Sequence, residues 1–182
     1  TMSKANFARS FLGQFHDSEN PEHLFKQKYA RLNKAWAARA GWPLFLPLAE
    51  KDQHFFEDIR SMLTNEQSEF DALILSLAKT TIDSLNVKGL RSFLERGDGD
   101  KSIELFRQLL TRLNVPDVDA HVALLHSVQA VRSSGVAHRK GTEYQKIMLK
   151  YGIDADDYAA AFEGILHQYV RLFDALLDEL GE

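Results

Sequence analysis

Arg132 and His138 are the two residues of this chain whose types and spacing best suit chemistry. They stand six positions apart, where a strongly helical pattern is interrupted. A guanidinium can hold a phosphate and the charge that builds on it, and an imidazole that titrates near neutral pH can move the proton of a hydroxyl group. Metal-free cleavage of RNA needs both groups, so the pair predicts phosphodiester chemistry without a metal ion.

Spacing alone does not bring the two side chains together. On a continuous helix, residues six apart point about 120° away from each other and lie about 9 Å apart along the axis. We expect the serines and glycine of 133–135 to end the helix. His138 then turns back toward Arg132, or both line a cleft shared with a second subunit. Ser133 is a candidate for orienting either group.

The surroundings of Arg132 leave two interpretations open. On a helical wheel it falls within the apolar arc formed by Val118, Val122, Leu125 and Val128. An arginine is rarely buried without a partner, so this one either pairs with a structural acid or lines a groove that is open to an anion.

The motif lies in the most basic part of an acidic chain. The net charge is −4, and residues 154–182 alone carry −7, which argues against a protein that coats nucleic acid along its whole surface. Residues 130–150 contain five basic residues and one acid. Among these bases, Arg139, Lys140 and Lys146 are candidates for holding RNA phosphates without reading sequence. The alternative is an ordinary solvated helix end.

The order of helix, Arg132, five residues, His138, basic turn and closing helix, within residues 117–151, resembles the HEPN superfamily of all-α domains. The resemblance implies a dimeric, metal-independent ribonuclease of a toxin–antitoxin, defence or RNA-processing system. Arg132 and His138 of both subunits would then face each other across a cleft. RNA, a second copy of the chain and an antitoxin or regulatory protein are the expected partners. Other members are catalytically silent, so the alternative is a non-catalytic helical interaction or RNA-binding module of a larger protein.

Two positions depart from the family pattern. Ser133 stands where asparagine is common, and it is a shorter polar substitute. One toxin subgroup has a tyrosine two residues after the histidine, as the target of its antitoxin, whereas this chain has Lys140 there. Tyr144 is too far along the chain to match, which puts that form of regulation in doubt.

Helical spacing of apolar residues dominates the elements that must position the motif. It predicts a long helix over 70–85 and a closing helix capped by Asp154, and Asn20-Pro21 predicts a helix that ends at Gly41. No segment alternates apolar and polar residues as strands do. The sequence therefore predicts an all-α multi-helix bundle in one domain over 1–182. Further helices are expected near residues 3–16, 50–63, 88–96, 101–114, 117–133 and 142–151.

Two other groups of residues have simpler expected roles. The apolar, proline-containing segment 42–48 must pack over the core, or else against a partner. Lys79, Asp83 and Asn86 share one face of the long helix, and a lysine–aspartate pair with a helix-ending asparagine explains them better than catalysis.

Composition excludes several classes of site. There is no cysteine, so thiol nucleophiles and thiolate zinc sites are ruled out. His121 and His126 are five residues apart, a poor spacing for two ligands of one metal, and no glycine-rich phosphate loop is present, so we expect no metal and no cofactor. The sequence shows no membrane span or signal-peptide core, and we expect a cytoplasmic protein. Thr1 precedes Met2, as a residue left by cloning would.

Overall fold

The computed structural model describes residues 20–95, 101–136 and 141–182. All regular structure in these ranges is helical, apart from one isolated antiparallel bridge between Phe45 and Leu85, so the predicted all-α class is confirmed. The elements are α2 (Pro21–Ala40), η1 (Glu50–Asp52), α3 (His54–Asp58), α4 (Gln67–Ala78), η2 (Lys79–Asp83), α5 (Val87–Leu94), α6 (Ser102–Arg112), α7 (Val118–Val136), α8 (Thr142–Lys150) and α9 (Tyr158–Leu180).

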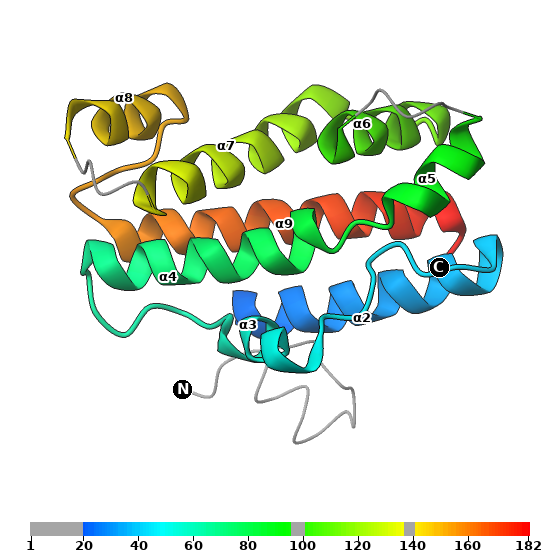
Figure 1. Cartoon of the computed structure of the whole chain (residues 1–182), viewed down its shortest axis with the longest axis horizontal. Coiled ribbons are helices and arrows are strands. Elements are labelled where there is room, and N and C mark those ends of the chain that lie inside the picture. The colour runs from blue at the N-terminus through cyan, green and yellow to red at the C-terminus, as the bar shows by residue number, and fades with distance from the viewer. Residues whose placement is uncertain (1–19, 96–100, 137–140) are drawn as a thin grey trace, which may run out of the picture.

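Helix α9 is the element around which the bundle is packed. It contacts α2, α7 and α4, while α8 lies at one end of the bundle and α5 with α6 at the other (Figure 1). Its apolar stripe is buried, as the periodicity of the sequence predicts. The buried residues of α9 are Phe162, Ile165, Leu166, Tyr169, Val170, Leu172, Phe173, Leu176 and Leu177.

The first described helix begins and ends where its local signals predict. The side chain of Asn20 accepts a hydrogen bond from the Glu22 amide at 3.0 Å, and Pro21 occupies the first helical position, where no amide donor is needed. Gly41 ends α2 with a φ of 81°, a left-handed conformation that glycine adopts without steric cost.

Two other helix predictions are wrong in their boundaries. The closing helix begins at Tyr158 and is capped by Asp157, which accepts from the Ala160 amide at 3.0 Å. Asp154 instead accepts from the Asp156 amide in the preceding turn. The segment predicted as a helix over 50–63 contains only η1 and α3, and the predicted helix over 3–16 lies outside the described residues.

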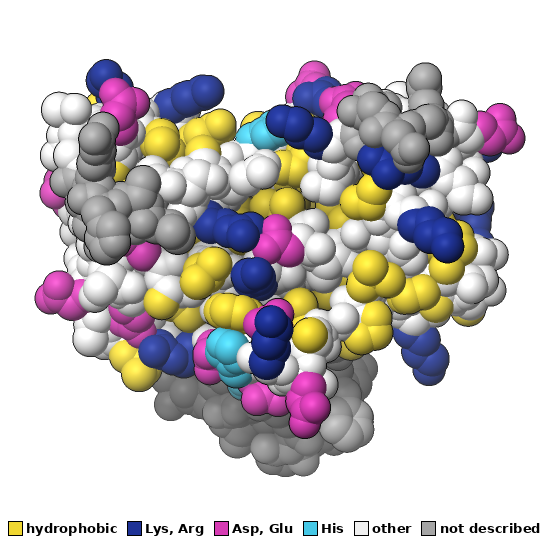
Figure 2. Space-filling view, viewed as in Figure 1, with side chains coloured by type: hydrophobic (Ala, Val, Ile, Leu, Met, Phe, Trp, Pro, Cys, Tyr) yellow, Lys and Arg dark blue, Asp and Glu magenta, His cyan; other side chains and the backbone are white. Residues whose placement is uncertain are grey.

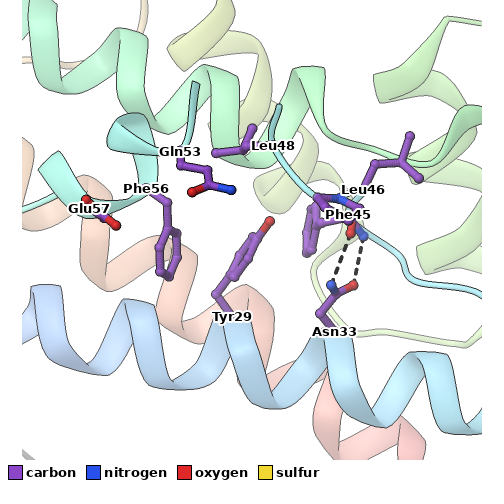
Figure 3. Close-up of a pocket in the computed structure, with 9 residues that line it drawn as sticks. Tyr29, Asn33, Phe45, Leu46, Leu48, Gln53, Phe56 and Glu57 are labelled. Carbon is purple, nitrogen blue, oxygen red and sulfur yellow. Dashed lines mark hydrogen bonds between the residues drawn. The ribbon is translucent and has the colours of Figure 1, made fainter. Parts of the chain in front are cut away.

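The segment 42–48 covers the core, which was the first of its two expected roles. Leu44 and Phe45 are buried, and the Asn33 side chain makes two hydrogen bonds to the Phe45 backbone (Figure 3). The Leu46 amide donates to the Ser84 carbonyl and the Asn86 amide donates to the Leu44 carbonyl. These bonds satisfy backbone groups that a proline-containing segment cannot satisfy by forming a helix.

On the face that carries α4 and α7, the described side chains form no continuous basic region (Figure 2). Lysine and arginine side chains are interspersed with acids and with apolar patches (Figure 2). None of the described helices combines the length and the apolar character needed to cross a lipid bilayer.

Candidate functional site

A π-helical turn, η2, interrupts the long helix predicted over 70–85. Such turns are rare and occur frequently at functional sites. The hydroxyl of Thr81 donates to the Leu77 carbonyl at 2.7 Å and lies 2.8 Å from the hydroxyl of Tyr169. The Thr80 carbonyl accepts from Tyr29 at 3.2 Å and also from the hydroxyl of Ser84. Side chains of α2 and α9 therefore hold the irregular backbone of this turn in place.

The π-helical turn positions an acid beside Arg132. The Arg132 guanidinium donates to the carboxylate of Asp83 at 2.7 Å, and the ammonium of Lys79 lies 3.5 Å from the other oxygen of the same carboxylate. The exposed fractions of these side chains are 26% for Arg132, 36% for Asp83 and 32% for Lys79. Two cations thus share one anion at a half-buried position, and we call these three residues the Arg132 cluster. The cluster carries one net positive charge.

The acid beside Arg132 was not identified from the sequence. Lys79 and Asp83 were expected to pair with each other, and they do, but the partnership of Asp83 with Arg132 joins residues 49 positions apart. The only sequence signal was a charged i, i+4 pair beside an apolar stripe. Asn86 does not end the long helix as a cap but begins the next one, because its side chain accepts from the Gly89 amide at 2.9 Å.

Helix α7 does not end at the serines that follow Arg132, contrary to the prediction. It continues to Val136, so no turn directly after Arg132 brings Arg132 and His138 together. Ser133 is exposed and donates to the Gln129 carbonyl, and Ser134 donates to the Val131 carbonyl. These hydroxyls bond to the preceding helical turn, which accommodates serine within the helix.

Three other predicted site residues lie outside the described part of the chain: His138, Arg139 and Lys140. Lys146 is described and lies on α8, where it is exposed and forms an ion pair with Glu143 at 2.9 Å. This hydrogen bond raises the pKa of Lys146 above its usual range, so the side chain carries a full positive charge at neutral pH.

Tyr144 is buried, although it is the tyrosine nearest to the motif. Its hydroxyl donates to the carboxylate of Asp71 at 2.8 Å. Burial, with Asp71 as a second cause, raises the pKa of Tyr144 well above its usual range. Its hydroxyl is therefore held in a structural contact between α8 and α4.

A separate hollow of about 390 Å³ lies between α2, α3 and the segment 42–48 (Figure 3). Its lining includes three aromatic residues, Tyr29, Phe45 and Phe56. Burial raises the pKa of Tyr29 to about 12, and its hydroxyl donates to the Thr80 carbonyl. None of the residues predicted to act on RNA lines this hollow.

In residues 20–95, 101–136 and 141–182, no three histidine or carboxylate side chains converge in a way that would hold a metal ion. Comparisons of the chain with protein-family models, with curated proteins and with solved structures find no match. The Arg132 cluster lies where α7 meets the π-helical turn, and it is the candidate functional site among the described residues.

Proposed function

We propose that this chain is a metal-independent RNA endonuclease of the HEPN type that acts as a homodimer, with Arg132 and His138 as its catalytic residues. The observation that carries the proposal is the half-buried guanidinium of Arg132, held in place by Asp83. A guanidinium has five N–H donors, and the contact with Asp83 uses one of them. The remaining donors are oriented before a phosphate arrives, which is the condition for stabilising charge in a transition state.

The reaction proceeds by attack of the RNA on itself. His138 takes the proton of the 2′-hydroxyl, the 2′-oxygen forms a bond to phosphorus, and the bond to the 5′-oxygen breaks. The products are a 2′,3′-cyclic phosphate and a 5′-hydroxyl end, which receives its proton from the imidazolium of the partner subunit or from water. Arg132 stabilises the negative charge of the phosphorane-like transition state.

The course of α7 supports an approach of His138 to Arg132. Val136 lies one helical turn beyond Arg132, about 6 Å along the axis and on nearly the same face. Only one residue separates Val136 from His138 in the sequence. Arg139, Lys140 and Lys146 would hold flanking phosphates, and Lys146 would exchange Glu143 for a phosphate oxygen. Ser133 bonds to its own helix and is assigned no catalytic step.

A second candidate function is a non-catalytic helical interaction or RNA-binding module. The same ion pair favours it, because Asp83 neutralises much of the charge that a phosphate would meet. In such a module Arg132 would join η2 to α7. The structural acid that this interpretation requires comes from the π-helical turn.

RNA cleavage by the purified chain in the presence of EDTA tests the proposal. We expect cleavage of single-stranded RNA with a cyclic phosphate product, lost in both Arg132→Ala and His138→Ala. The matched control is Arg107→Ala, which removes another arginine whose guanidinium bonds to an aspartate of a different helix, here Asp119 at 2.5 Å. That variant should cleave normally.

Two results would contradict the nuclease. One is cleavage that persists in Arg132→Ala or His138→Ala and so comes from a contaminant. The other is that the wild-type chain binds RNA or protein but does not cleave RNA. In that case Arg132→Ala should weaken binding only to the extent that it lowers the melting temperature. The second result would establish the module.

A further inference from the structure

Two adjoining hollows form a groove between α7 and α9. The larger hollow has a volume of about 550 Å³ and the smaller one about 190 Å³. Ala120, Leu124 and Gln168 line both, so the two hollows are parts of one continuous groove. The groove shares no residue with the Arg132 cluster.

The narrow end of the groove combines a cation with an imidazole. Arg171 and Gln168 reach it from α9, and His121 reaches it from α7, with Asp117 just before that helix. Within the described ranges, Arg171 makes no ion pair or hydrogen bond, whereas most other described arginines contact an acid or a carbonyl. Arg171 is also the one basic residue of the strongly acidic stretch 154–182. Its guanidinium is therefore available to an anion.

His121 lies where a bound anion would favour its protonated form. Without an anion, the pKa of His121 is lowered, because burial and the nearby Arg171 outweigh the opposing effect of Asp117. The nearby Pro116 carbonyl also favours the protonated ring, although less than Asp117 does. An anion beside the ring would favour the imidazolium, which could then donate to it.

The wide end of the groove has a floor of small side chains. Its lining includes Ala123 and Ser127 of α7 and Ala161 and Gly164 of α9, together with Tyr151 and one carboxylate, Asp154. A Cβ atom added to Gly164 would meet no other atom within 4 Å. The protein leaves this space unfilled, and a flat organic group can lie in it against the apolar floor and the aromatic ring of Tyr151.

We propose that this groove binds a phosphate monoester, with the phosphate at Arg171, His121 and Gln168 and the organic part in the wide end. Arg171 supplies a fork of donors that matches phosphate oxygens. The amide nitrogen of Gln168 donates to the Gly164 carbonyl at 3.4 Å and has a second N–H for the phosphate. The carboxylate of Asp117 faces His121 and stabilises the imidazolium that the bound phosphate requires. Mononucleotides belong to this class of ligand, because they join a phosphate to a flat ring system.

Calorimetric titration of the full chain with inorganic phosphate and with uridine monophosphate tests this site. We expect the monophosphate to bind more tightly than phosphate, and Arg171→Gln to weaken both at least about tenfold. Gly164→Leu fills the wide end, so it should abolish the advantage of the monophosphate and leave the affinity for phosphate unchanged. Arg39→Gln, which removes a distant surface arginine of α2, should bind both ligands as the wild type does.

The pH dependence separates His121 from the ligand itself. Sulfate does not titrate near neutral pH, so any change in its affinity reports on the protein. Because the bound anion favours the charged form of His121, sulfate should bind more tightly at about pH 5.5 than at about pH 8. This difference should be absent in His121→Gln.

The inference is overturned if Arg171→Gln binds phosphate like the wild type, or if Gly164→Leu binds the monophosphate as tightly as the wild type does. The first result places the phosphate elsewhere, and the second places the organic part outside the groove. Arg132→Ala should leave both affinities unchanged. That variant therefore keeps the outcome separate from the proposed nuclease activity.

Discussion

At the scale of single residues, the hydroxyl pair of Thr81 and Tyr169 joins the π-helical turn to the central helix. Thr81 donates its hydrogen to the Leu77 carbonyl, so Tyr169 must donate to Thr81. Tyr169 is completely buried, and its burial raises the pKa of the phenol. The pair thus joins the backbone that positions Asp83 to the core around α9.

Removing the Thr81 hydroxyl should lower the stability of the fold more than removing the Tyr169 hydroxyl. Thr81→Val leaves the buried Tyr169 hydroxyl without its acceptor, so the free energy of unfolding should fall by about 1 to 3 kcal/mol. Tyr169→Phe leaves Thr81 bonded to Leu77, so the loss should be about 1 kcal/mol or less. Urea denaturation of the two variants measures both losses. A larger loss in Tyr169→Phe would show that Tyr169 does not donate this hydrogen bond to Thr81.

At the scale of elements, the carboxylate of Glu69 organises the chain that enters α4. It accepts hydrogen bonds from the Leu63 amide at 3.0 Å and from the Thr64 amide at 2.8 Å, and Arg60 lies 2.5 Å away. The pKa of Glu69 is lowered to about 2, mainly by the hydrogen bond from the Leu63 amide and then by the one from the Thr64 hydroxyl. The ionised carboxylate therefore helps to stabilise the start of the helix.

The stabilisation by Glu69 should depend on pH in a definite direction. Since the folded protein lowers the pKa from an ordinary value of 4.5 to about 2, the contribution is complete above about pH 4.5 and disappears as the pH falls toward 2. The melting temperature of Glu69→Gln should thus lie below that of the wild type at neutral pH and approach it in acid. A constant difference across this range would exclude the carboxylate charge as the cause.

Helix α5 depends on a glycine for its close contact with Trp42. A Cβ atom at Gly89 would lie 2.4 Å from the indole ring, and that ring packs edge-on against Trp36. Gly89→Ala should therefore destabilise the fold by about 1 to 3 kcal/mol through overpacking. The control is Gly164→Ala, where the added methyl group meets open space and should stabilise α9 by about 0.5 to 1 kcal/mol. Thermal unfolding of both variants checks the contrast, and a stabilised Gly89→Ala would contradict it.

At the scale of the whole molecule, the proposed nuclease requires two copies of the chain. Isologous contact would bring the C-terminal ends of both α7 helices near the two-fold axis. The chain has no cysteine, so an introduced one can report on this geometry without interference. Ser133→Cys should form an intersubunit disulfide in a dimer detected by light scattering, while Thr111→Cys, on the exposed face of α6, should not. A monomer at micromolar concentration would rule out the composite site.

Binding of RNA should follow the basic stretch and not the net charge of the molecule. Contacts from Arg139, Lys140 and Lys146 to phosphates release counterions, so affinity should fall steeply with added salt. A variant with alanine at all three positions should lose affinity to a similar extent for unrelated single-stranded sequences and show a shallower salt slope. Filter binding at several salt concentrations measures both effects, and an affinity that salt leaves unchanged would favour the interaction module.

The sequence by itself determined the features that depend on neighbouring residues. The all-α class follows from helical spacing of apolar residues, and α2 begins at Pro21 and ends before Gly41 because a cap, a proline and a left-handed glycine act within one turn. Tertiary structure decided the rest. The pairing of Arg132 with Asp83 and the hydrogen bonds between segments 42–48 and 84–86 join residues far apart in the chain. Local patterns cannot specify such contacts, because they depend on how the helices pack. The extension of α7 to Val136 was also not predicted, because the serines that were expected to end the helix bond to its preceding turn.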